Sequence, residues 1–372
     1  MIDWNNIEQT ALGRYEEELR QTPQSPVNHA EGDVLVHTRM VCDALKRLPE
    51  YQELNQRRQH IVYVAALLHD IGKIHTTKYV DGDWHTPHHA PTGSNMAREL
   101  LWREYGLCGS KELMEIREAI CLLVRYHSFP PVAIERENPQ LRLHRMAANG
   151  LLVPDFSIRL LCMLCKADML GRKCDDQQEV LDRITLCEEL AKEEGCNDGC
   201  YLFPSSYTQR AFLAGRDVWK DQELYDDCWG EVVLMSGLPG TGKDTWIQQN
   251  MPDLPMISLD DIRRANKIPP TAAQGRVANI AREQAKEYLR QHQSFVWNAT
   301  NITAQMRESL ISLFETYHAN VRIVYLETEW QTLLERNRSR EDAVPQSVIE
   351  DMLGKMTLPE ACEARKVEWR SV

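Results

Sequence analysis

The stretch Gly237-Leu-Pro-Gly-Thr-Gly-Lys-Asp-Thr245 decides the fold that we expect for this chain. It follows the apolar run Glu231–Ser236, which is typical of a buried strand, and it precedes Trp246-Ile-Gln, which can begin a helix. A glycine-rich loop in that setting can turn successive backbone N–H groups toward one phosphate, and the helix adds the positive end of its dipole. The stretch therefore predicts a phosphate-binding P-loop. The alternative is a glycine loop without a ligand.

The loop departs from the usual pattern G-x-x-x-x-G-K-[ST] at its last position. Gly237, Gly242 and Lys243 fit the pattern, but Asp244 stands where a hydroxyl residue is usual, and Thr245 supplies a hydroxyl one residue later. Lys243 would reach the terminal phosphates, and either Asp244 or Thr245 would hold magnesium. We expect ATP or another nucleoside triphosphate with Mg2+ to be bound by Gly237, Gly240, Thr241, Gly242, Lys243, Asp244 and Thr245.

Strands and helices alternate from residue 230 onward. This alternation predicts an α/β domain with a small parallel sheet covered on both faces, whose ligands collect at the carboxyl ends of the strands. We expect strands at Val232–Ser236, Pro255–Ser258, Ser294–Asn298 and Val321–Leu326. We expect helices at Asp260–Ala265, Ala272–Gln291, Ala304–Tyr317, Trp330–Asn337 and Pro345–Gly354.

Charged residues follow two of these strands. Asp260 could accept the proton of an attacking hydroxyl, and Arg263, one helical turn on, could hold an acceptor phosphate. The alternative for Asp260 is a helix N-cap. Arg336 and Arg340 lie one turn apart and could clamp transferring phosphates as part of a lid. The alternative for these two arginines is a solvated charged helix face.

The chain before residue 195 has a helical pattern. One break, Tyr79-Val-Asp-Gly-Asp-Trp84, predicts a hairpin with an Asp-Gly turn. We expect an all-α domain at 1–194, an ordered connector at 195–229 and the α/β domain at 230–372. The helices are expected at Ile7–Arg20, Val34–Leu48, Ile61–Leu68, Ser94–Tyr105, Lys111–Tyr126, Ser157–Met169 and Gln177–Lys192.

Histidines and aspartates gather along the helical half. Imidazoles that share a carboxylate suit a divalent transition metal, and an adjacent His-Asp pair can hold one or two ions. Such an ion would activate water against a phosphoester. Any one of these histidines alone is more often a surface or core residue. The candidates are His37, His69-Asp70, His85, His88, His89, His127 and Asp168.

The run His69-Asp-Ile-Gly-Lys73, the hairpin, then His89-Ala-Pro-Thr-Gly93 resemble the HD-domain metal phosphohydrolases over about Val34–Arg172. The resemblance implies that Lys73 contacts a substrate phosphate. It implies one metal held by His37, His69, Asp70 and Asp168, and a second held by His89 and His127 with Asp70 bridging. His88 is the rival of His89, and we prefer His89 for its distance to Gly93.

Asp260-x-x-Arg263 and Arg336-x-x-x-Arg340 resemble the 5′-hydroxyl polynucleotide kinases over about Val232–Lys355. The resemblance implies that Asp260 is the general base, that Arg263 binds the acceptor's 3′-phosphate, and that the lid arginines hold the donor phosphates. Asn298 departs from that family, in which aspartate is frequent at this place.

The order of the two halves resembles the bacterial HD-Pnk end-healing proteins. That implies a kinase acting on 5′-hydroxyl ends of DNA or RNA, and an HD phosphoesterase acting on 2′,3′-cyclic or terminal phosphates. The treated ends are those that a ligase seals, so we expect a functional link to a polynucleotide ligase. One alternative is a nucleoside or nucleotide kinase fused to a nucleotide phosphohydrolase. Another is an ATP-sensing module that regulates an HD hydrolase.

The composition limits the partners. The formal net charge of −12 over 372 residues argues against non-specific coating of nucleic acid, although it allows a local basic groove. Eleven scattered cysteines, the absence of a signal-peptide pattern and the absence of a long apolar run predict a cytoplasmic protein that does not enter a membrane.

Overall fold

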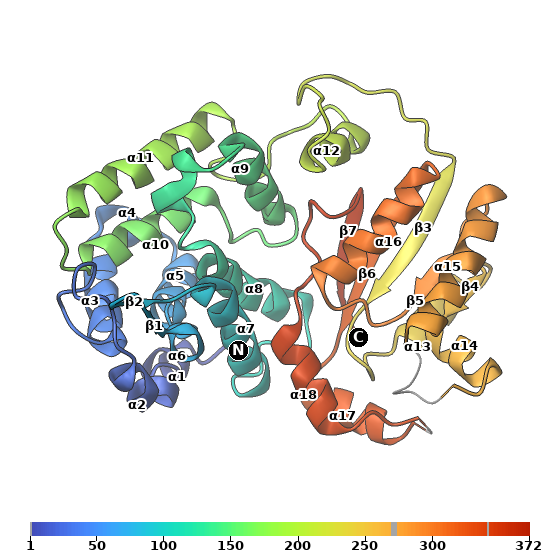
Figure 1. Cartoon of the computed structure of the whole chain (residues 1–372), viewed down its shortest axis with the longest axis horizontal. Helices are drawn as coiled ribbons and strands as arrows, with labels where there is room; N and C mark the ends of the chain where they lie inside the picture. The colour runs from blue at the N-terminus through green and yellow to red at the C-terminus, as the bar shows by residue number, and fades with distance from the viewer. Residues whose placement is uncertain (1, 269–273, 341) are drawn as a thin grey trace. The chain divides into compact units, whose positions relative to one another are not determined.

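A computed structural model of the chain describes residues 2–268, 274–340 and 342–372 (Figure 1). The chain divides into two compact units, one made of residues up to Leu107 with 112–201 and the other of 108–111 with 202–372. The start of the predicted helix Ala272–Gln291 lies outside the described residues. Across the described ranges, no helix is both long enough and apolar enough to span a membrane.

The first unit is helical, as predicted. The central helix α10 (Ile158–Leu170) is buried almost throughout and contacts α3, α5 and α11. Side chains cap these helices at their first turns: Asp33 caps α3, Asn55 caps α5 and Ser157 caps α10. The other helices are α1 (Trp4–Thr10), α2 (Glu16–Gln21), α3 (Val34–Arg47), α4 (Pro49–Gln52), α5 (Gln56–Leu68), α6 (Lys73–Thr76), α7 (His89–Arg103), α8 (Lys111–Tyr126), α9 (Pro139–Ala148) and α11 (Gln177–Glu193).

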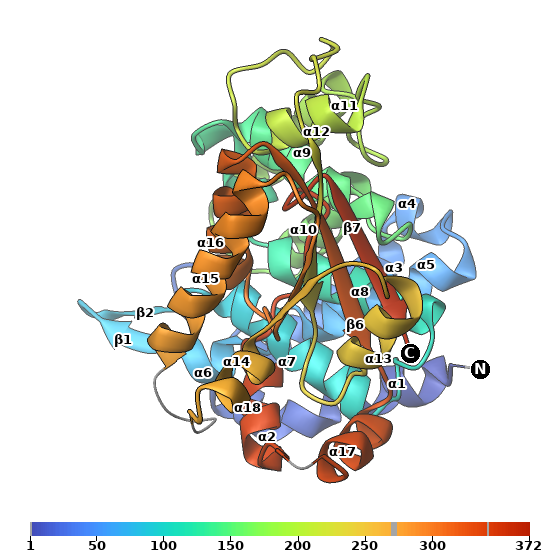
Figure 2. The same cartoon turned by 90° about the vertical axis from the view of Figure 1, so that its right-hand side faces the viewer.

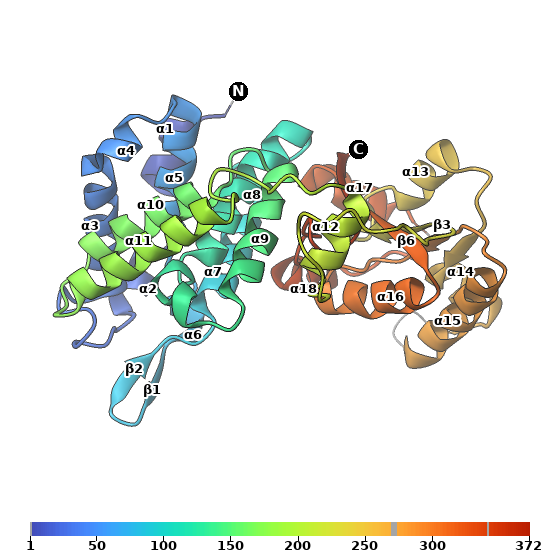
Figure 3. The same cartoon turned by 90° about the horizontal axis from the view of Figure 1, so that it is seen from above.

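The predicted hairpin is present as β1 (Lys78–Val80) and β2 (Asp83–His85). Asp81 and Gly82 both have positive φ angles, 51° and 89°, which is the geometry of a tight two-residue turn. Figure 3 shows this hairpin extending away from the helices of its unit. Three expectations about the helices were wrong in their bounds. The predicted helix Ile7–Arg20 is broken by a 3-10 turn at Gly13–Tyr15. α5 begins at Gln56, ahead of the expected Ile61, and α7 begins at His89, ahead of the expected Ser94.

The second unit contains a five-stranded parallel sheet in the order β4-β5-β3-β6-β7. Its strands are β3 (Gly230–Ser236), β4 (Met256–Ser258), β5 (Val296–Asn298), β6 (Ala319–Glu327) and β7 (Lys366–Ser371). Its helices are α12 (Ser206–Leu213), α13 (Lys243–Asn250), α14 (Leu259–Ala265), α15 (Gln274–Arg290), α16 (Ala304–Thr316), α17 (Trp330–Arg338) and α18 (Gln346–Lys355). The fold class predicted from the sequence is therefore confirmed, with β7 as a strand that it did not include.

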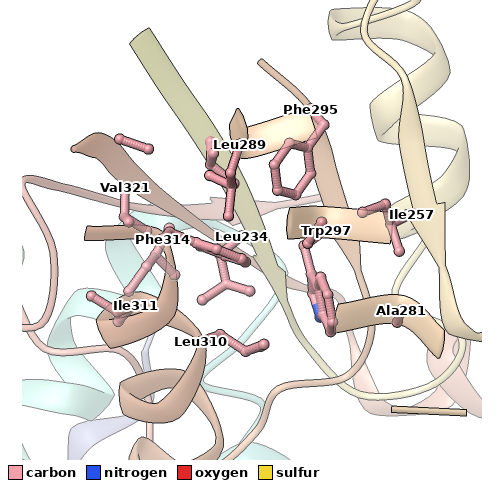
Figure 4. Packing of buried hydrophobic residues seen from close by; sticks show 14 of the residues in the cluster. Leu234, Ile257, Ala281, Leu289, Phe295, Trp297, Leu310, Ile311, Phe314 and Val321 are labelled. Atoms are coloured by element: carbon pink, nitrogen blue, oxygen red, sulfur yellow. The ribbon is translucent and has the colours of Figure 1, made fainter. Parts of the chain in front are cut away.

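Helices cover both faces of the sheet (Figure 2). Leu234 and Trp297 pack against α15 and α16 on one face, where Phe314 fills the centre (Figure 4). Val233 and Val296, which are the neighbours of those residues along each strand, pack against Ile247 of α13 on the other face. Successive side chains of a strand point to opposite faces, so apolar runs rather than alternation mark strands that are buried on both faces.

The segment between the two predicted domains is ordered. Residues 195–201 belong to the first unit, and the rest belongs to the second. Ser205 caps α12, and Arg210 of that helix donates to Glu315 at 2.6 Å and to the carbonyl of Cys362 at 2.8 Å. These contacts fix the segment against the second unit.

Candidate functional site

The six predicted metal ligands of the first unit come together. His37 lies on α3, His69 and Asp70 follow α5, His89 begins α7, His127 follows α8 and Asp168 lies on α10. All are buried except His89, whose side chain is 18% exposed. The chain thus brings together side chains that are as much as 131 positions apart in sequence, from residue 37 to residue 168.

One oxygen of Asp70 faces the first group of predicted ligands. Asp70 Oδ2 lies 3.2 Å from His69 Nε2 and 3.5 Å from His37 Nε2. Asp168 Oδ1 lies 3.0 Å from the same His37 nitrogen and 3.9 Å from His69 Nε2. His37, His69 and Asp70 therefore offer donor atoms that all lie within 4.8 Å of one another, and Asp168 faces two of these three, an arrangement that suits a metal ion.

The other oxygen of Asp70 faces the second group. Asp70 Oδ1 lies 3.6 Å from His89 Nε2 and 3.7 Å from His127 Nε2, and these two nitrogens are 3.1 Å apart. Asp70 is thus placed to bridge two ions. His88 is exposed and precedes α7 in a left-handed conformation, so the geometry favours His89 over His88 as the ligand.

Hydrogen bonds fix the orientation of three of these imidazole rings. The Nδ1 atoms of His69, His89 and His127 lie 2.8, 2.9 and 2.7 Å from the backbone carbonyls of Ala66, Thr86 and Val124 respectively. A carbonyl can only accept, so each Nδ1 carries a hydrogen, and in the neutral ring the lone pair is on Nε2. All three rings therefore offer the tautomer that a metal needs.

Two glycines allow the helices to approach at the cluster. A Cβ at Gly72 would lie 2.1 Å from the carbonyl oxygen of His89 and 2.5 Å from the nitrogen of Gly93. A Cβ at Gly171 would lie 2.6 Å from the backbone nitrogen of Val41. The first contact holds the His69–Lys73 turn against α7, and the second holds the end of α10 against α3. This explains physically why glycine occurs in these motifs.

The charges of the cluster favour ionised carboxylates and neutral imidazoles at the second group. Burial raises the pKa of Asp70, but His69 and Lys73 outweigh it and hold that pKa well below its ordinary value. Arg172 and His37 do the same for the pKa of Asp168. Burial lowers the pKa of His127 to about 3, with His89 and His69 contributing.

The donor set of this cluster fits divalent transition metals. Asp168 Oδ1 is buried and makes no hydrogen bond, although it points at the His37 and His69 nitrogens. An unsatisfied buried carboxylate oxygen is costly unless an ion takes it. Imidazole and carboxylate together suit several divalent transition metals without selecting one.

Lys73 contacts the cluster itself. Its ammonium donates to Asp70 Oδ2 at 2.8 Å and to Gln24 Oε1 at 2.8 Å, and the side chain is buried. Its predicted contact with a substrate phosphate stays a prediction. Arg172, which lies 3.5 Å from Asp168 Oδ2, is a further cation at the cluster that the motif did not single out.

The P-loop of the second unit adopts the conformation that its glycines permit. Gly237, Gly240 and Gly242 have φ angles of 145°, 85° and 84°, and a Cβ at Gly240 would lie 2.7 Å from the carbonyl of Leu333. Lys243 begins α13, and its ammonium lies across the loop, donating to the carbonyls of Gly237 and Leu238 at 2.9 Å each. Thr241 is buried and donates to the carbonyl of Leu238.

The two candidates for magnesium differ in their surroundings. Asp244 is exposed in the first turn of α13, and its Oδ1 accepts a hydrogen bond from Asn298 Nδ2 at 2.5 Å. Thr245 is exposed on the same helix. Asn298 ends β5, so the sheet itself holds the Asp244 carboxylate.

Asp260 and Arg340 meet near the P-loop. Arg340 Nη2 lies 3.3 Å from Asp260 Oδ2. Burial is the main cause of the lowered pKa of Lys243, and the charges of Arg340 and Asp260 act on that pKa in opposite directions. The alternative that Asp260 is the helix cap was wrong, because Ser258 caps α14 by accepting from the nitrogen of Asp261. The Asp260 carboxylate therefore does not cap α14, and it pairs with Arg340 instead.

The remaining predicted kinase residues lie on α14 and α17. Arg263 is half-buried on α14, and Arg336 is exposed on α17, where its Nη1 lies 3.5 Å from the position that a Cβ at Gly242 would take. Asn337 is buried and exchanges two hydrogen bonds with the backbone of Val344, at 2.7 and 3.1 Å. That exchange ties the end of α17 to the segment ahead of α18.

Two family models match separate parts of the chain. Residues 34–162 match the model described as HD domain, and residues 232–359 match the model described as AAA domain. The chain joins an HD domain to a P-loop domain. The HD match ends before Asp168, which the structure nevertheless brings to the HD cluster.

The similar proteins cover only parts of the chain. Heterogeneous nuclear ribonucleoprotein U-like protein 2 of Mus musculus is 26% identical, and that of Homo sapiens 25% identical, each over 151 residues and 36% of this chain. The chain spans 20% of the length of these curated relatives. A solved structure described as "a putative kinase" from Chloroflexus aurantiacus j-10-fl aligns at 15% identity and a TM-score of 0.33, over 39% of this chain and 86% of that chain.

Sequence reasoning missed two residues that contact the HD cluster. Glu31 lies 2.9 Å from His37 Nδ1, and His29 lies 2.8 Å from the same carboxylate oxygen. Both precede α3 in a loop without periodic pattern. The only local signal is the spacing His29-Ala-Glu31 a few residues before His37.

Proposed function

We propose that this chain is a bifunctional enzyme that heals the ends of broken nucleic acid strands. The P-loop domain would transfer the terminal phosphoryl group of ATP or another nucleoside triphosphate to a 5′-hydroxyl. The HD domain would hydrolyse 2′,3′-cyclic or terminal phosphates. The two products are the ends that a polynucleotide ligase joins, which links the proposed activity to ligation in the cytoplasm.

The observation that carries the kinase half is the ion pair of Asp260 with Arg340, at 3.3 Å, in the domain that contains the P-loop. A loop that only binds nucleotide needs no carboxylate at this place. Asp260 could accept the proton of an incoming hydroxyl, and Arg340 could stabilise the phosphoryl group as it moves. Arg263 lies on α14 with Asp260 and would hold the acceptor phosphate. Arg336 lies on α17, which ends at Arg338, and would hold the donor phosphates together with Arg340, which follows that helix.

The HD half is supported by the arrangement around Asp70. His37, His69, Asp70 and Asp168 would hold one divalent transition metal, and Asp70, His89 and His127 a second. When bound, such a metal lowers the pKa of water and polarises a phosphate oxygen. The residues of the chain fix the rings, keep the carboxylates ionised and place Lys73 next to the bridging carboxylate.

A nucleic acid substrate is supported by the order of the two domains and by the similarity to proteins named as ribonucleoproteins. One experiment tests the whole proposal. The protein is incubated with labelled ATP, Mg2+ and Mn2+, and with DNA and RNA oligonucleotides that carry a 5′-hydroxyl, the RNA also ending in a 2′,3′-cyclic phosphate. We expect label at the 5′ end and loss of the cyclic phosphate.

Matched variants separate the two halves. Asp260→Asn should lower labelling by about 10²–10⁴-fold and leave cyclic-phosphate opening intact. Asp70→Asn should stop cyclic-phosphate opening and leave labelling intact. Competition by nucleosides and mononucleotides identifies the acceptor class. Labelling of nucleosides or mononucleotides alone would replace the proposal by a small-molecule kinase with a nucleotide phosphohydrolase. ATP binding without transfer to any acceptor would overturn the kinase half.

A further inference from the structure

Glu31 is a buried carboxylate that neither motif accounts for. Its side chain has no exposed surface, and its Oε1 lies between two imidazoles, 2.8 Å from His29 Nδ1 and 2.9 Å from His37 Nδ1. Its Oε2 accepts from the backbone nitrogen of Lys173 at 2.9 Å, and the nitrogen of Ala30 donates to the carbonyl of the same residue at 2.9 Å. The loop before α3 is thereby fixed to the segment that follows α10.

The group His29, Glu31 and His37 has the composition of a metal site, but the chemistry of His37 argues against a third ion. A neutral imidazole has one lone pair, so only one of its nitrogens can bind a metal. His37 Nε2 faces Asp168 and Asp70 at 3.0 and 3.5 Å. If that nitrogen binds the metal, Nδ1 carries the hydrogen and faces a carboxylate, which can only accept.

The partner of His37 differs in charge from the partners of the other three histidines. His69, His89 and His127 each face a neutral backbone carbonyl through Nδ1, whereas His37 faces Glu31. A carboxylate on the far nitrogen makes an imidazole more basic and a stronger ligand. The N–H of His37 is not aligned with the oxygen as in a regular hydrogen bond, so the effect at 2.9 Å rests mainly on charge.

The two halves of the cluster are therefore unequal. The half with His37 and His69 has two carboxylates, Asp70 and Asp168, and the additional charge of Glu31 behind it. Within the part of the chain that the structure describes, the half with His89 and His127 has the shared Asp70 as its only carboxylate, and His89 is partly exposed. We propose that Glu31 positions and polarises His37, and that this makes the His37–His69 site the tighter and first-filled of the two metal sites. The inference rests on the proposed metal binding of the HD domain.

Titration of the full chain with Mn2+ tests this inference, with calorimetry as the readout. We expect a tight step and a weaker step of one ion each. Glu31→Gln keeps the size of the side chain and removes its charge, and it should weaken the tight step by about 10–100-fold while leaving the weaker step unchanged. His89→Ala should remove the weaker step and leave the tight one.

Controls distinguish positioning from loss of fold. Glu17→Gln makes the same chemical change at an exposed residue of α2, and it should alter neither step. The melting temperature of the metal-free protein checks that Glu31→Gln is folded. If that variant is unfolded, His29→Gln takes its place, because it removes a contact of Glu31 while keeping the carboxylate, and it should weaken the tight step to a smaller extent.

The outcomes separate this inference from the proposed function. Two equal steps in the wild-type protein, or a Glu31→Gln variant that weakens both steps or neither, would overturn the inference and leave the HD activity in place. No binding of Mn2+, Co2+ or Ni2+ at all would overturn both. A Co2+ absorption spectrum that changes on Glu31→Gln at one equivalent, and not on Glu17→Gln, would support the inference independently of catalysis.

Discussion

Asn298 donates a hydrogen bond of 2.5 Å to the carboxylate of Asp244, which joins the end of β5 to the first turn of α13. Because the Asn298 amide holds Oδ1 of Asp244, it also fixes the direction in which the other carboxylate oxygen, Oδ2, points. The loop sequence alone allows either Asp244 or Thr245 to bind magnesium. The bond to Asn298 favours Asp244, because an oriented carboxylate is a better ligand for magnesium than a hydroxyl without such a hold.

We therefore predict that Asp244→Ala lowers the rate of phosphoryl transfer by roughly 100-fold, which corresponds to about 2.7 kcal/mol of transition-state stabilisation. Thr245→Ala should change it by less than about threefold. Asp244→Ser, which restores the usual residue of the loop, should recover part of the rate. The measurement is kcat as a function of Mg2+ concentration. Loss of a magnesium ligand should also raise the Mg2+ concentration at which the rate is half-maximal. A larger effect from Thr245→Ala than from Asp244→Ala would reverse the assignment.

Substitutions of Asp260 and Arg340 should both lower kcat, by different mechanisms. Asp260→Asn removes a proton acceptor and should lower kcat by about 10²–10⁴-fold with little change in ATP binding. Arg340→Gln should lower kcat as well, and Arg340→Lys should recover only part, because lysine cannot make the paired contacts of a guanidinium. The ion pair between the two residues is exposed to solvent and contributes little to stability, so the melting temperature should be nearly unchanged. A large fall in melting temperature would instead indicate a structural role.

Nucleotide binding should depend on pH through Lys243. Burial lowers the pKa of this lysine to about 8, against the opposing charge of Asp244. Below pH 8 the free protein already carries the proton. Above pH 8 it has lost the proton, and a bound triphosphate restores the pKa toward its ordinary value of about 10.4, so binding takes up a proton.

Affinity for ATP should accordingly be flat below pH 7.5 and should fall by up to about tenfold per pH unit between pH 8.5 and 10. Calorimetry in two buffers of different ionisation enthalpy measures the proton uptake directly. Lys243→Arg, whose charge does not titrate in this range, should show no such slope. Equal slopes in the two proteins would assign the titration to another group.

The sequence was sufficient for the features that local patterns encode. The P-loop, the strand alternation that follows it, and the Asp-Gly hairpin were all predicted from runs of a few residues. The strand β7 was not, because its residues are polar at alternate positions as an edge strand requires, and they occur after a long gap from β6. Glu31 was missed for another reason, since its role exists only once His37 and Lys173 lie beside it.

The side chain of Arg307 shows the same limit within the core. It is fully buried on α16 and donates to both oxygens of Glu363, at 2.6 and 2.7 Å, and to the carbonyls of Asn301 and Thr357. The contacts tie α16 to the segment that leads into β7. No pattern in the sequence distinguishes this arginine from an exposed one, because its carboxylate partner Glu363 lies 56 positions away and the carbonyl of Thr357 lies 50 positions away.

We predict that Arg307→Met destabilises the P-loop domain by about 3–5 kcal/mol, because it leaves the Glu363 carboxylate buried without its cation. Thermal unfolding measures this, and a shift on addition of ATP identifies the transition that belongs to this domain. The double variant Arg307→Met with Glu363→Gln should recover part of the loss. Arg290→Met, at an exposed arginine of α15, is the control and should change stability by less than about 0.5 kcal/mol. A small effect of Arg307→Met would contradict the role of this contact.

Gly72 contacts α7 and is not itself a metal ligand, yet its substitution should weaken metal binding. In Gly72→Ala the new Cβ would meet backbone atoms of His89 and Gly93 at 2.1 and 2.5 Å, so α7 must move away from the His69–Lys73 turn. His89 begins α7 and faces Asp70 Oδ1 at 3.6 Å, and a shift of 1 Å is enough to spoil a ligand position. We expect Gly72→Ala to weaken the second metal-binding step by tenfold or more and to slow phosphoester hydrolysis, with the kinase unaffected.

Gly13→Ala is the matched control, because nothing lies within 4 Å of its Cβ position. Unchanged metal binding in Gly72→Ala would mean that α7 is free to adjust, and that the close approach of the two glycines does not set the position of His89.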